Sequence, residues 1–431
     1  MKFHIITLGC KINQYESQAL AESLSARGNT YVSSPEQART IIINSCAVTS
    51  RAVRDLKKIC RKTGRSSPRS RIIITGCAAQ VLEKELSALK EVYRVVPQQE
   101  KKSLLTGLNP LAETAQDSPD FFISDYFRSR AVVKVQDGCT HRCTYCIVPL
   151  TRGKSVSRPP EIILQEISRL LIRGFNEITL GGINLRLYGK DLTPGVDFWD
   201  LINFLQANIP LDKNPGLRIR LSSLEPSELN SKALETIASS SMLCPHLHIS
   251  LQSGSTAVLE KMNRGHYNPQ DLINFSRRLK HIWPVFGMGA DILTGFPGET
   301  QENFQKTLEL VQNLPLSYAH IFPYSPRPDT PAASFPGQIS DQEKKSRTGK
   351  INALIQRKKQ TFLNRLSSLE KLNLVMETET KGMSEYYVEC ALKQPVSIRP
   401  KQMIQVKPLY VRDNKLIAEP VQTVKKHAGL I

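Results

Sequence analysis

The first hundred residues alternate between short apolar runs and stretches in which apolar positions have helical spacing. The apolar runs, rich in isoleucine and threonine, lie at 3–8, 40–44 and 71–75. Helical spacing follows them, over 13–26, over a very basic segment, and finally as far as residue 89. Strands that are apolar at nearly every position are typical of a parallel sheet buried on both faces. The pattern therefore predicts an α/β domain at the start of the chain.

The alternation of strands and helices resumes after a polar segment, 109–119, which predicts a linker. Six further strand candidates separated by helical spacing predict an open or partial (β/α) barrel. A helix rich in Lys, Arg and Leu follows, to about residue 369. Short alternating runs at 386–390 and 403–406 then predict a small antiparallel barrel. The six strand candidates are 131–135, 177–180, 217–221, 246–251, 284–292 and 318–322.

These patterns predict an α/β protein of three domains. We expect an N-terminal parallel-sheet domain over 1–112, a central partial (β/α)6 barrel over 125–358 and a small C-terminal antiparallel β-barrel over 362–425. No apolar run approaches the length of a membrane span, and the apolar start is too short for a secretory signal. We therefore expect a soluble cytoplasmic protein with no membrane partner. In that reducing compartment, nine cysteines indicate metal binding or catalysis before disulfides.

The charge balance favours a polyanionic partner. Lys and Arg outnumber Asp and Glu by 58 to 39, a formal net charge of +19. The alternative is a basic protein without such a partner. Clustering favours nucleic acid, because the segment 51–71 carries many basic residues with Asp55 as its single acidic one, and a second basic group lies within 344–359.

Cys139, Cys143 and Cys146 lie in one loop with the spacing C-x3-C-x2-C, after a predicted barrel strand. Three thiolates on one loop can hold a [4Fe-4S] cluster and leave its fourth iron open to a small molecule. The alternative is a zinc site, which needs a fourth ligand such as His141 or a distant residue. Because His141 lies inside the loop, folding back onto the same metal would be strained. The spacing therefore favours the cluster, at the end of a barrel strand where such folds hold their chemistry.

Cys10, Cys46 and Cys77 each come just after a predicted strand of the N-terminal sheet, and a Gly or Ser precedes each of them. Neighbouring parallel strands end at the same edge of a sheet, so we expect the three thiolates to converge on a second three-ligand site. The alternative is that they are ordinary buried cysteines, a common fate of free Cys. Three cysteines in equivalent positions favour the metal site. The other cysteines, which fit neither pattern, are interpreted as structural: Cys60, Cys244 and Cys390.

The two cysteine trios together resemble those of the radical S-adenosylmethionine (SAM) methylthiotransferases, and the resemblance covers nearly the whole chain. It implies two [4Fe-4S] clusters. The cluster on Cys139, Cys143 and Cys146 would bind SAM and cleave it reductively to a radical, and the auxiliary cluster on the other trio would present sulfur. A second SAM would supply the methyl group. Matching stretches are 180–184, 217–226, 248–255, 291–300 and 323–328.

Four residues in or near these stretches are candidates for contact with SAM. Gly181, Gly182 and Gly295 lie at strand ends, where a glycine lets a small polar ligand approach the backbone. Glu225 belongs to another matching stretch. We expect all four to contribute to the SAM site.

Residues 9–16 resemble the branch of the family that modifies N6-threonylcarbamoyladenosine at position 37 of tRNA. The resemblance implies methylthiolation of C2 of that adenine, with tRNA as the partner, no DNA, and a reductant protein such as flavodoxin or ferredoxin. Ser250 and Asp329 depart from the family pattern. Three alternatives remain: the branch acting on isopentenyladenosine, the branch acting on a ribosomal protein, and an RNA-binding protein with structural metal sites.

The terminal segment 362–425 resembles, loosely, the TRAM-type RNA-binding barrel that ends many family members. Tyr386 and Tyr387 in this segment are candidates for stacking on bases. The alternative is that they pack in the barrel core or on its rim.

Overall fold

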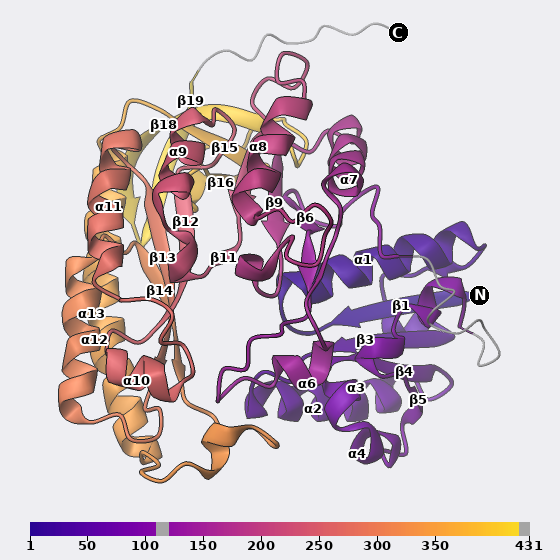
Figure 1. Ribbon diagram of the computed structural model, residues 1–431. Coiled ribbons are helices and arrows are strands. Elements are labelled where there is room, and N and C mark those ends of the chain that lie inside the picture. The colour runs from indigo at the N-terminus through magenta and orange to yellow at the C-terminus, as the bar shows by residue number, and fades with distance from the viewer. Residues whose placement is uncertain (109–119, 422–431) are drawn as a thin grey trace, which may run out of the picture.

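The computed structural model describes residues 1–108 and 120–421, so the expected linker at 109–119 lies outside the described residues. Three bodies follow one another along the chain (Figure 1). An indigo α/β domain is followed by a large central half-barrel and by a small yellow barrel at the top of the view. Within the described residues, none of the helices is both long and apolar enough to span a membrane.

The N-terminal domain has the five-stranded parallel sheet that the apolar runs predict, in the order β2-β1-β3-β4-β5. All six residues of β3 are buried, because a helix covers each face. Helix α1 packs Leu24 against Phe3 and Ile42 on one face, and α2 packs Leu56 and Cys60 on the other. The elements named are β1 (Lys2–Thr7), β2 (Thr30–Tyr31), β3 (Thr40–Ser45), β4 (Arg71–Gly76), β5 (Val92–Val95), α1 (Lys11–Ala26) and α2 (Ser50–Ser66).

One expected helix of this domain is divided. The segment after β4, predicted to be helical as far as residue 89, forms two short helices, α3 (Cys77–Val81) and α4 (Glu83–Ser87). They separate at Leu82, whose φ of −127° is outside the helical region. The remaining short helices are η1 (Pro35–Gln37), η2 (Gln98–Glu100) and α5 (Ser103–Thr106).

Seven parallel strands form the central half-barrel: six lie at the positions expected from the sequence, and the short β11 follows directly after β10. They make two sheets, β10-β9-β6 and β11-β12-β13-β14, joined by a bridge between Ile219 and Leu243. The strand predicted over 284–292 begins only at Gly287, because Pro284 has no amide hydrogen to donate to a neighbouring strand. The strands are β6 (Ala131–Lys134), β9 (Glu177–Gly181), β10 (Arg218–Leu221), β11 (Ser223–Leu224), β12 (His246–Gln252), β13 (Gly287–Thr294) and β14 (Tyr318–Pro323).

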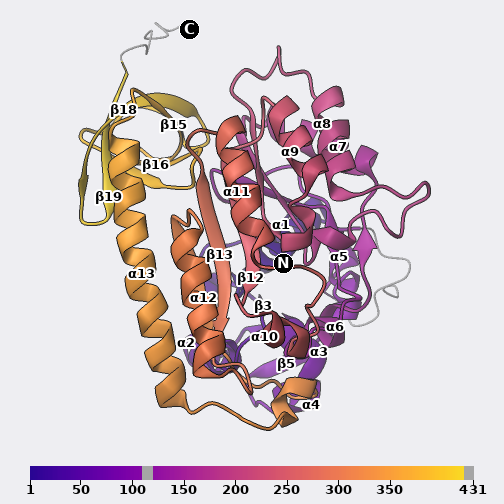
Figure 2. The same ribbon diagram turned by 60° about the vertical axis from the view of Figure 1, so that its left-hand side comes forward.

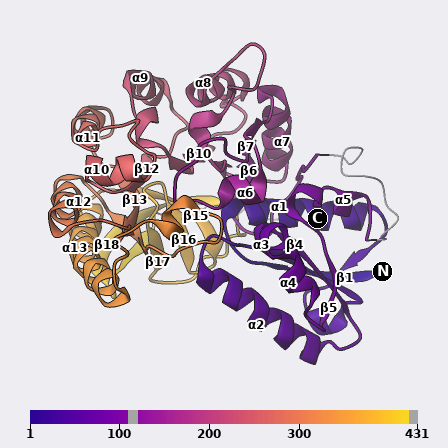
Figure 3. The ribbon, with the colours of Figure 1, turned by 60° about the horizontal axis from the view of Figure 1, so that its bottom comes forward.

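Helices surround the half-barrel in an arc, and the N-terminal domain occupies its open side (Figure 3). Short elements connect the strands at the end where the cysteines lie. The arc consists of α7 (Pro160–Ile172), α8 (Phe198–Asn208), α9 (Ser231–Ser239), α11 (Asp271–Ile282), α12 (Gln301–Asn313) and α13 (Asp341–Ser367). The short elements are β7 (Gln136–Asp137), α6 (Val148–Arg152), β8 (Val156–Ser157), η3 (Leu185–Leu187), η4 (Pro226–Glu228), α10 (Thr256–Lys261) and η5 (Pro331–Ser334).

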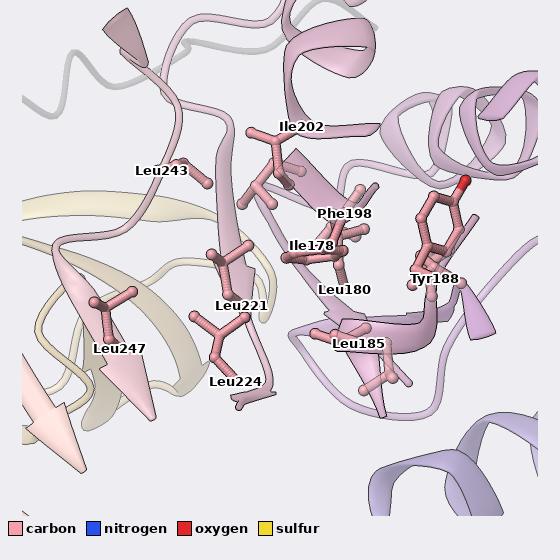
Figure 4. Packing of buried hydrophobic residues seen from close by; sticks show 14 of the residues in the cluster. Ile178, Leu180, Leu185, Tyr188, Phe198, Ile202, Leu221, Leu224, Leu243 and Leu247 are labelled. Carbon is pink, nitrogen blue, oxygen red and sulfur yellow. The ribbon is translucent and has the colours of Figure 1, made fainter. Parts of the chain in front are cut away.

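The main core lies between these helices and the strands. Figure 4 shows Ile178 and Leu180 of β9 in contact range of Phe198 of α8, with Leu221 of β10 beside them. These side chains are almost completely buried, and each Leu, Ile or Phe removed from water contributes about 1.5–3 kcal/mol. The core thus holds the strands that carry the cysteine loop in place.

The small barrel at the end of the chain closes in the order β15-β16-β17-β19-β18. Its pairings are antiparallel, as expected, except that β17 and β19 run parallel. Helix α13 runs the length of the molecule to this barrel (Figure 2) and packs Leu363 and Leu366 into its core. The strands are β15 (Leu372–Thr378), β16 (Lys381–Ser384), β17 (Glu389–Leu392), β18 (Met403–Arg412) and β19 (Lys415–Pro420).

Candidate active site

Cys10, Cys46 and Cys77 lie together at the carboxyl edge of the N-terminal sheet. They follow β1, β3 and β4, which are neighbours in the sheet. Gly9, with φ of +108°, lets two of the loops meet, because a Cβ there would lie 2.7 Å from the Cβ of Cys46. Strand order therefore gathers three thiols that are far apart in the sequence.

A buried network of charges supports this edge. The guanidinium of Arg152 donates to Asn13 Oδ1 at 2.6 Å and to Glu16 Oε1 at 2.9 Å, and the Cys10 thiol lies 3.7 Å from the same Asn13 oxygen. Lys101 Nζ contacts the other Glu16 oxygen at 2.6 Å. Burial alone would raise the pKa of Glu16, but Arg152 and Lys101 hold it well below its usual range. The positive charge of Arg152 thus lies beside this trio, and the sequence pattern did not indicate it.

Cys139, Cys143 and Cys146 lie on a loop at the mouth of the half-barrel. Backbone bonds hold its ends, from the Cys139 amide to the Gly153 carbonyl at 3.0 Å and from the Cys146 amide to the Cys143 carbonyl at 3.0 Å. The Thr144 amide donates to the Met262 carbonyl at 3.1 Å, which ties the middle of the loop to the end of α10. The three thiols are therefore presented on one anchored turn.

His141, the fourth ligand of the zinc alternative, faces a different group. Its Nε2 lies 2.6 Å from the carbonyl oxygen of Asn263. The side-chain nitrogen of Asn184, Nδ2, lies 3.5 Å from Cys139 Sγ. His141 is therefore engaged by a backbone carbonyl, and Asn184 provides a hydrogen-bond donor to Cys139 Sγ.

Glu225 lies beside the same loop through an arginine that sequence reasoning missed. Arg264 donates from its two terminal nitrogens to both carboxylate oxygens of Glu225, at 2.9 and 2.6 Å, and its Nη1 is 3.9 Å from Cys143 Sγ. Burial raises the pKa of Glu225, but His266 and Arg264 beside it leave the pKa below its ordinary value. No local pattern marked Arg264, because its role depends on two residues that are distant in the sequence.

The three glycine candidates are placed differently. Gly182 follows β9 beside Gln136, whose side-chain oxygen accepts hydrogen bonds from the Ile183 and Asn184 amides at 2.9 Å. That turn places the Asn184 side chain beside Cys139 Sγ. Gly181, the last residue of β9, faces Ile12 of α1.

Gly295 lies in the turn that follows β13. Its amide donates to Glu299 at 2.7 Å, and Lys344 covers the position that a side chain would take. The structure thus brings Gly182 and Glu225 next to the cysteine loop and leaves Gly295 in a turn packed on α13.

The donor chemistry of both trios fits an iron–sulfur cluster. In the described part of the chain, neither trio is among the groups whose ligand atoms all lie within 4.8 Å of one another, whereas sulfurs on one zinc ion would be about 3.8 Å apart. A cluster holds its cysteines on separate iron atoms and needs wider spacing. Burial raises the pKa of Cys46 to about 11 and of Cys146 to about 12, so these thiols would ionise at neutral pH only on binding a metal.

Polar atoms are also available for a second ligand beside the loop. Among the described residues, Asn184 Oδ1 and Ser222 Oγ are buried without a hydrogen-bond partner. Buried polar atoms are normally paired, so these two fit a polar ligand bound next to Cys139.

A cavity of about 280 Å³ lies between the two trios. One wall contains Val48 and Thr49, just after Cys46, and the opposite wall contains Tyr145 and Cys146. Phe322 and neighbouring residues of β14 form a third side. Both halves of the molecule therefore border one space.

A wider groove of about 740 Å³ opens beside this cavity and shares Thr49, Phe322 and Tyr324 with it. Arg51 and Arg54 of α2 line one side, and the first turns of α13 line the other with Lys344 and Lys345. The two basic clusters that stand out in the sequence thus meet at the entrance to the cavity.

Tyr387 is half-buried and packs against other aromatic rings. Its ring lies 4.7 Å from that of His246 and 5.5 Å from that of Tyr318, with the Arg220 guanidinium 5.2 Å away. Tyr386 packs against the core of the small barrel. These contacts fit the packing alternative, while both side chains stay partly exposed.

Comparisons with known proteins place the chain in a family. Residues 2–97 match the model of the uncharacterized protein family UPF0004, and residues 133–311 match that of the radical SAM superfamily. Solved structures show the fold alone: the radical SAM methyltransferase TsrM from Kitasatospora setae has a TM-score of 0.57 at 13% identity, covering 77% of each chain.

Curated relatives extend over most of the chain. The threonylcarbamoyladenosine tRNA methylthiotransferase MtaB of Thermotoga maritima is 36% identical over 401 residues, 89% of this chain and 90% of the relative. That of Bacillus subtilis is 32% identical over 413 residues, 91% and 89% of the two chains. The tRNA-2-methylthio-N(6)-dimethylallyladenosine synthase of Caldicellulosiruptor saccharolyticus is 32% identical over 421 residues, 90% and 87%. From these matches, the chain belongs to the radical SAM tRNA methylthiotransferase family, in the branch of the threonylcarbamoyladenosine enzymes.

Proposed function

We propose that this protein methylthiolates C2 of N6-threonylcarbamoyladenosine at position 37 of tRNA. The observation that carries the proposal is the cavity of about 280 Å³ with Val48 and Thr49 on one wall and Cys146 on the other. A group bound there borders Cys146 and the loop that follows Cys46. The names of the relatives from Thermotoga maritima and Bacillus subtilis support the substrate.

We assign a SAM-binding [4Fe-4S] cluster to Cys139, Cys143 and Cys146, and an auxiliary [4Fe-4S] cluster to the trio on the N-terminal sheet. When bound, these groups supply a SAM-derived radical, the sulfur and the methyl group. The protein's own residues orient and shield them. Asn184 donates toward one sulfur, Arg264 holds Glu225 beside another, and Tyr145 closes the cavity wall next to Cys146.

We assign SAM to the space beside the cysteine loop, next to Gly182 and Glu225, with Gly181 behind it. The unpaired oxygens of Asn184 and Ser222 favour that place. Gly295 has its amide engaged by Glu299, and a SAM contact at Gly295 would need that turn to open.

The basic groove supports tRNA as the polyanion. Arg51, Arg54 and Lys345 are exposed along it, and such side chains attract phosphates before any specific contact is made. An anticodon loop lying in the groove would deliver one base to the cavity. We propose the cytoplasm as the place of this reaction and a flavodoxin- or ferredoxin-type protein as the reductant.

We propose the domain bounds that the sequence pattern suggests: 1–112 for the auxiliary-cluster domain, 125–358 for the radical SAM core and 362–425 for a TRAM-like barrel. The sheet orders of the three bodies support this division.

The second candidate substrate is dimethylallyladenosine in tRNA, which the name of the Caldicellulosiruptor saccharolyticus relative favours. The same cavity and cysteine trios would serve that reaction. The nucleoside formed distinguishes the two.

The experiment uses reconstituted enzyme, SAM, a reductant and tRNA carrying either modified adenosine. Wild-type enzyme is expected to cleave SAM and to methylthiolate threonylcarbamoyladenosine, measured by mass spectrometry of nucleosides. Cys146→Ala should lose both reactions, because the SAM-binding cluster needs that thiolate. Cys46→Ala should still cleave SAM and lose methylthiolation.

Cys60→Ala is the matched control, because Cys60 is a buried cysteine of α2 outside both trios. It should keep both reactions. Full methylthiolation by Cys46→Ala would contradict the assignment of the auxiliary cluster, and product found only on dimethylallyladenosine would replace the proposed substrate.

A further inference from the structure

Three side chains inside the half-barrel face one another at the spacing of metal ligands. In residues 1–108 and 120–421, His248, Asp291 and His320 are the one group of three His, Cys, Asp or Glu residues whose ligand atoms all lie within 4.8 Å of one another. Asp291 Oδ1 is 3.0 Å from His248 Nε2 and 3.2 Å from His320 Nδ1. Ligands bound at about 2.1 Å to one metal ion at right angles have this separation.

Strand register builds this group. The three residues lie on β12, β13 and β14, which are neighbouring parallel strands. Asp291 is paired directly with His320. The site therefore stands on rigid sheet and not on a loop, which is how precise ligand geometry is held.

A second layer of hydrogen bonds orients the buried histidine. The Tyr318 hydroxyl lies 2.9 Å from His248 Nδ1 and 2.9 Å from His246 Nε2. Histidines that bind metal are typically held through their other ring nitrogen in this way. A Cβ at position 289 would lie 2.5 Å from both His248 Nδ1 and the Tyr318 oxygen. Gly289 therefore provides the room for this contact.

We propose that His248, Asp291 and His320 form a binding site for a divalent transition-metal ion of the Zn²⁺ or Fe²⁺ class. Two imidazoles and one carboxylate are the donors that such ions prefer. An anion is a poor occupant, because Asp291 contributes a negative charge. In the other explanation of the geometry, Asp291 accepts hydrogen bonds from both imidazoles and no ion binds.

The location gives the ion access to the active-site cavity. Asp291 lines the cavity that also contacts Cys146, and His320 is exposed, at 56% for its side chain. Three protein ligands leave coordination positions open. Those positions would accept an oxygen donor from the molecule in the cavity.

The test measures metal and does not depend on transferase activity. Anaerobically reconstituted enzyme is equilibrated with Zn²⁺, desalted and analysed for zinc and iron per chain. Zinc X-ray absorption then identifies the donor atoms. The variants are Asp291→Asn and His320→Ala, with His281→Ala as a control because His281 is an exposed histidine on α11.

Wild type and His281→Ala should bind one zinc ion per chain through nitrogen and oxygen only. Asp291→Asn and His320→Ala should keep their iron, as a sign of intact folding, and bind zinc at least about 10- to 100-fold more weakly, since losing even an outer-shell partner costs that much. The proposal is overturned if wild type retains no zinc, if the zinc has sulfur donors, or if both variants bind it as tightly as wild type.

Discussion

At the scale of single residues, Arg264 links the Glu225 carboxylate to the cysteine loop at the mouth of the half-barrel. Its planar guanidinium donates to both oxygens of Glu225, and Nη1 lies 3.9 Å from Cys143 Sγ. Nη2 also donates to the Ser250 carbonyl at 2.7 Å. Ser250, a departure from the family pattern, thus contributes through its backbone, so the change of side chain leaves this contact intact.

Replacing Arg264 by Lys tests this arrangement. Lysine keeps the charge but has one nitrogen, so it cannot hold both Glu225 oxygens and approach Cys143 together. We expect SAM cleavage to slow by about 10- to 100-fold, the usual effect of removing a residue that orients a metal site. The measurement is 5′-deoxyadenosine released per chain. As a control, Arg278→Lys on the exposed face of α11 should cleave SAM at the wild-type rate. An unchanged rate of SAM cleavage in Arg264→Lys would show that the two-pronged guanidinium contact is dispensable.

At the scale of elements, the first turns of α2 and α13 form the basic groove. Thr49 begins α2, because its side-chain oxygen accepts a hydrogen bond from the Ala52 amide at 3.1 Å. Ser340 does the same for α13, with the Glu343 amide at 3.2 Å. Both helices therefore present their amino ends, which favour anions, at the rim of the cavity.

Neutralising the groove should weaken tRNA binding and make it less sensitive to salt. We expect the variant with Arg51→Gln, Arg54→Gln and Lys345→Gln to lower the slope of log affinity against log salt by roughly one for each lost phosphate contact. Filter binding at several salt concentrations measures it.

The control removes an equal charge from the outer face of α11, with Arg277→Gln, Arg278→Gln and Lys280→Gln, all exposed in the structure. This control should bind tRNA as wild type does. Equal losses in both variants would mean that net charge alone, and not the groove, attracts the tRNA.

At the scale of the whole molecule, Glu177 joins the half-barrel to the small barrel. Arg218 and Arg220 contact its carboxylate at 2.6 and 2.7 Å, and their remaining donors reach backbone carbonyls of the small barrel, including those of Met383 and Ser384. Burial raises the pKa of Glu177, but Arg220 and Arg218 hold it well below its usual range. One buried carboxylate thus neutralises the arginines that dock two bodies.

Glu177→Gln should destabilise the protein strongly. It leaves buried arginines without a counter-charge, which costs about 3–5 kcal/mol of unfolding free energy. Urea unfolding at neutral pH measures it, with Glu302→Gln, an exposed i,i+4 partner of Lys306, as a control that should leave the midpoint unchanged. Because folding lowers the pKa of Glu177, its stabilisation is present above a pH of about 4.3 and is lost as pH falls further. The variant should lack this acid-dependent loss, and a midpoint equal to that of wild type would contradict the docking role.

The sequence by itself determined the features that are written in short stretches of chain. The alternation of apolar runs predicted the parallel sheet, the half-barrel and the terminal barrel, and the structure confirms all three. The loop over 139–146 and the stretch 9–16 indicated the family and branch that the comparisons confirm. Such signals are local, because the period of buried positions and the spacing of ligands on one loop need no knowledge of distant residues. The individual SAM contacts and domain bounds stay predictions.

Only the tertiary structure decided which distant groups meet. Periodicity tells which face of a strand is buried, but register and sheet order choose its neighbour. Arg264 therefore reached Glu225, Asp291 met two histidines, and Tyr387 packed against His246, without any local sign of it. The cavity between the two cysteine trios has the same origin, because its walls come from a sheet edge and a barrel mouth that lie about a hundred residues apart in the sequence.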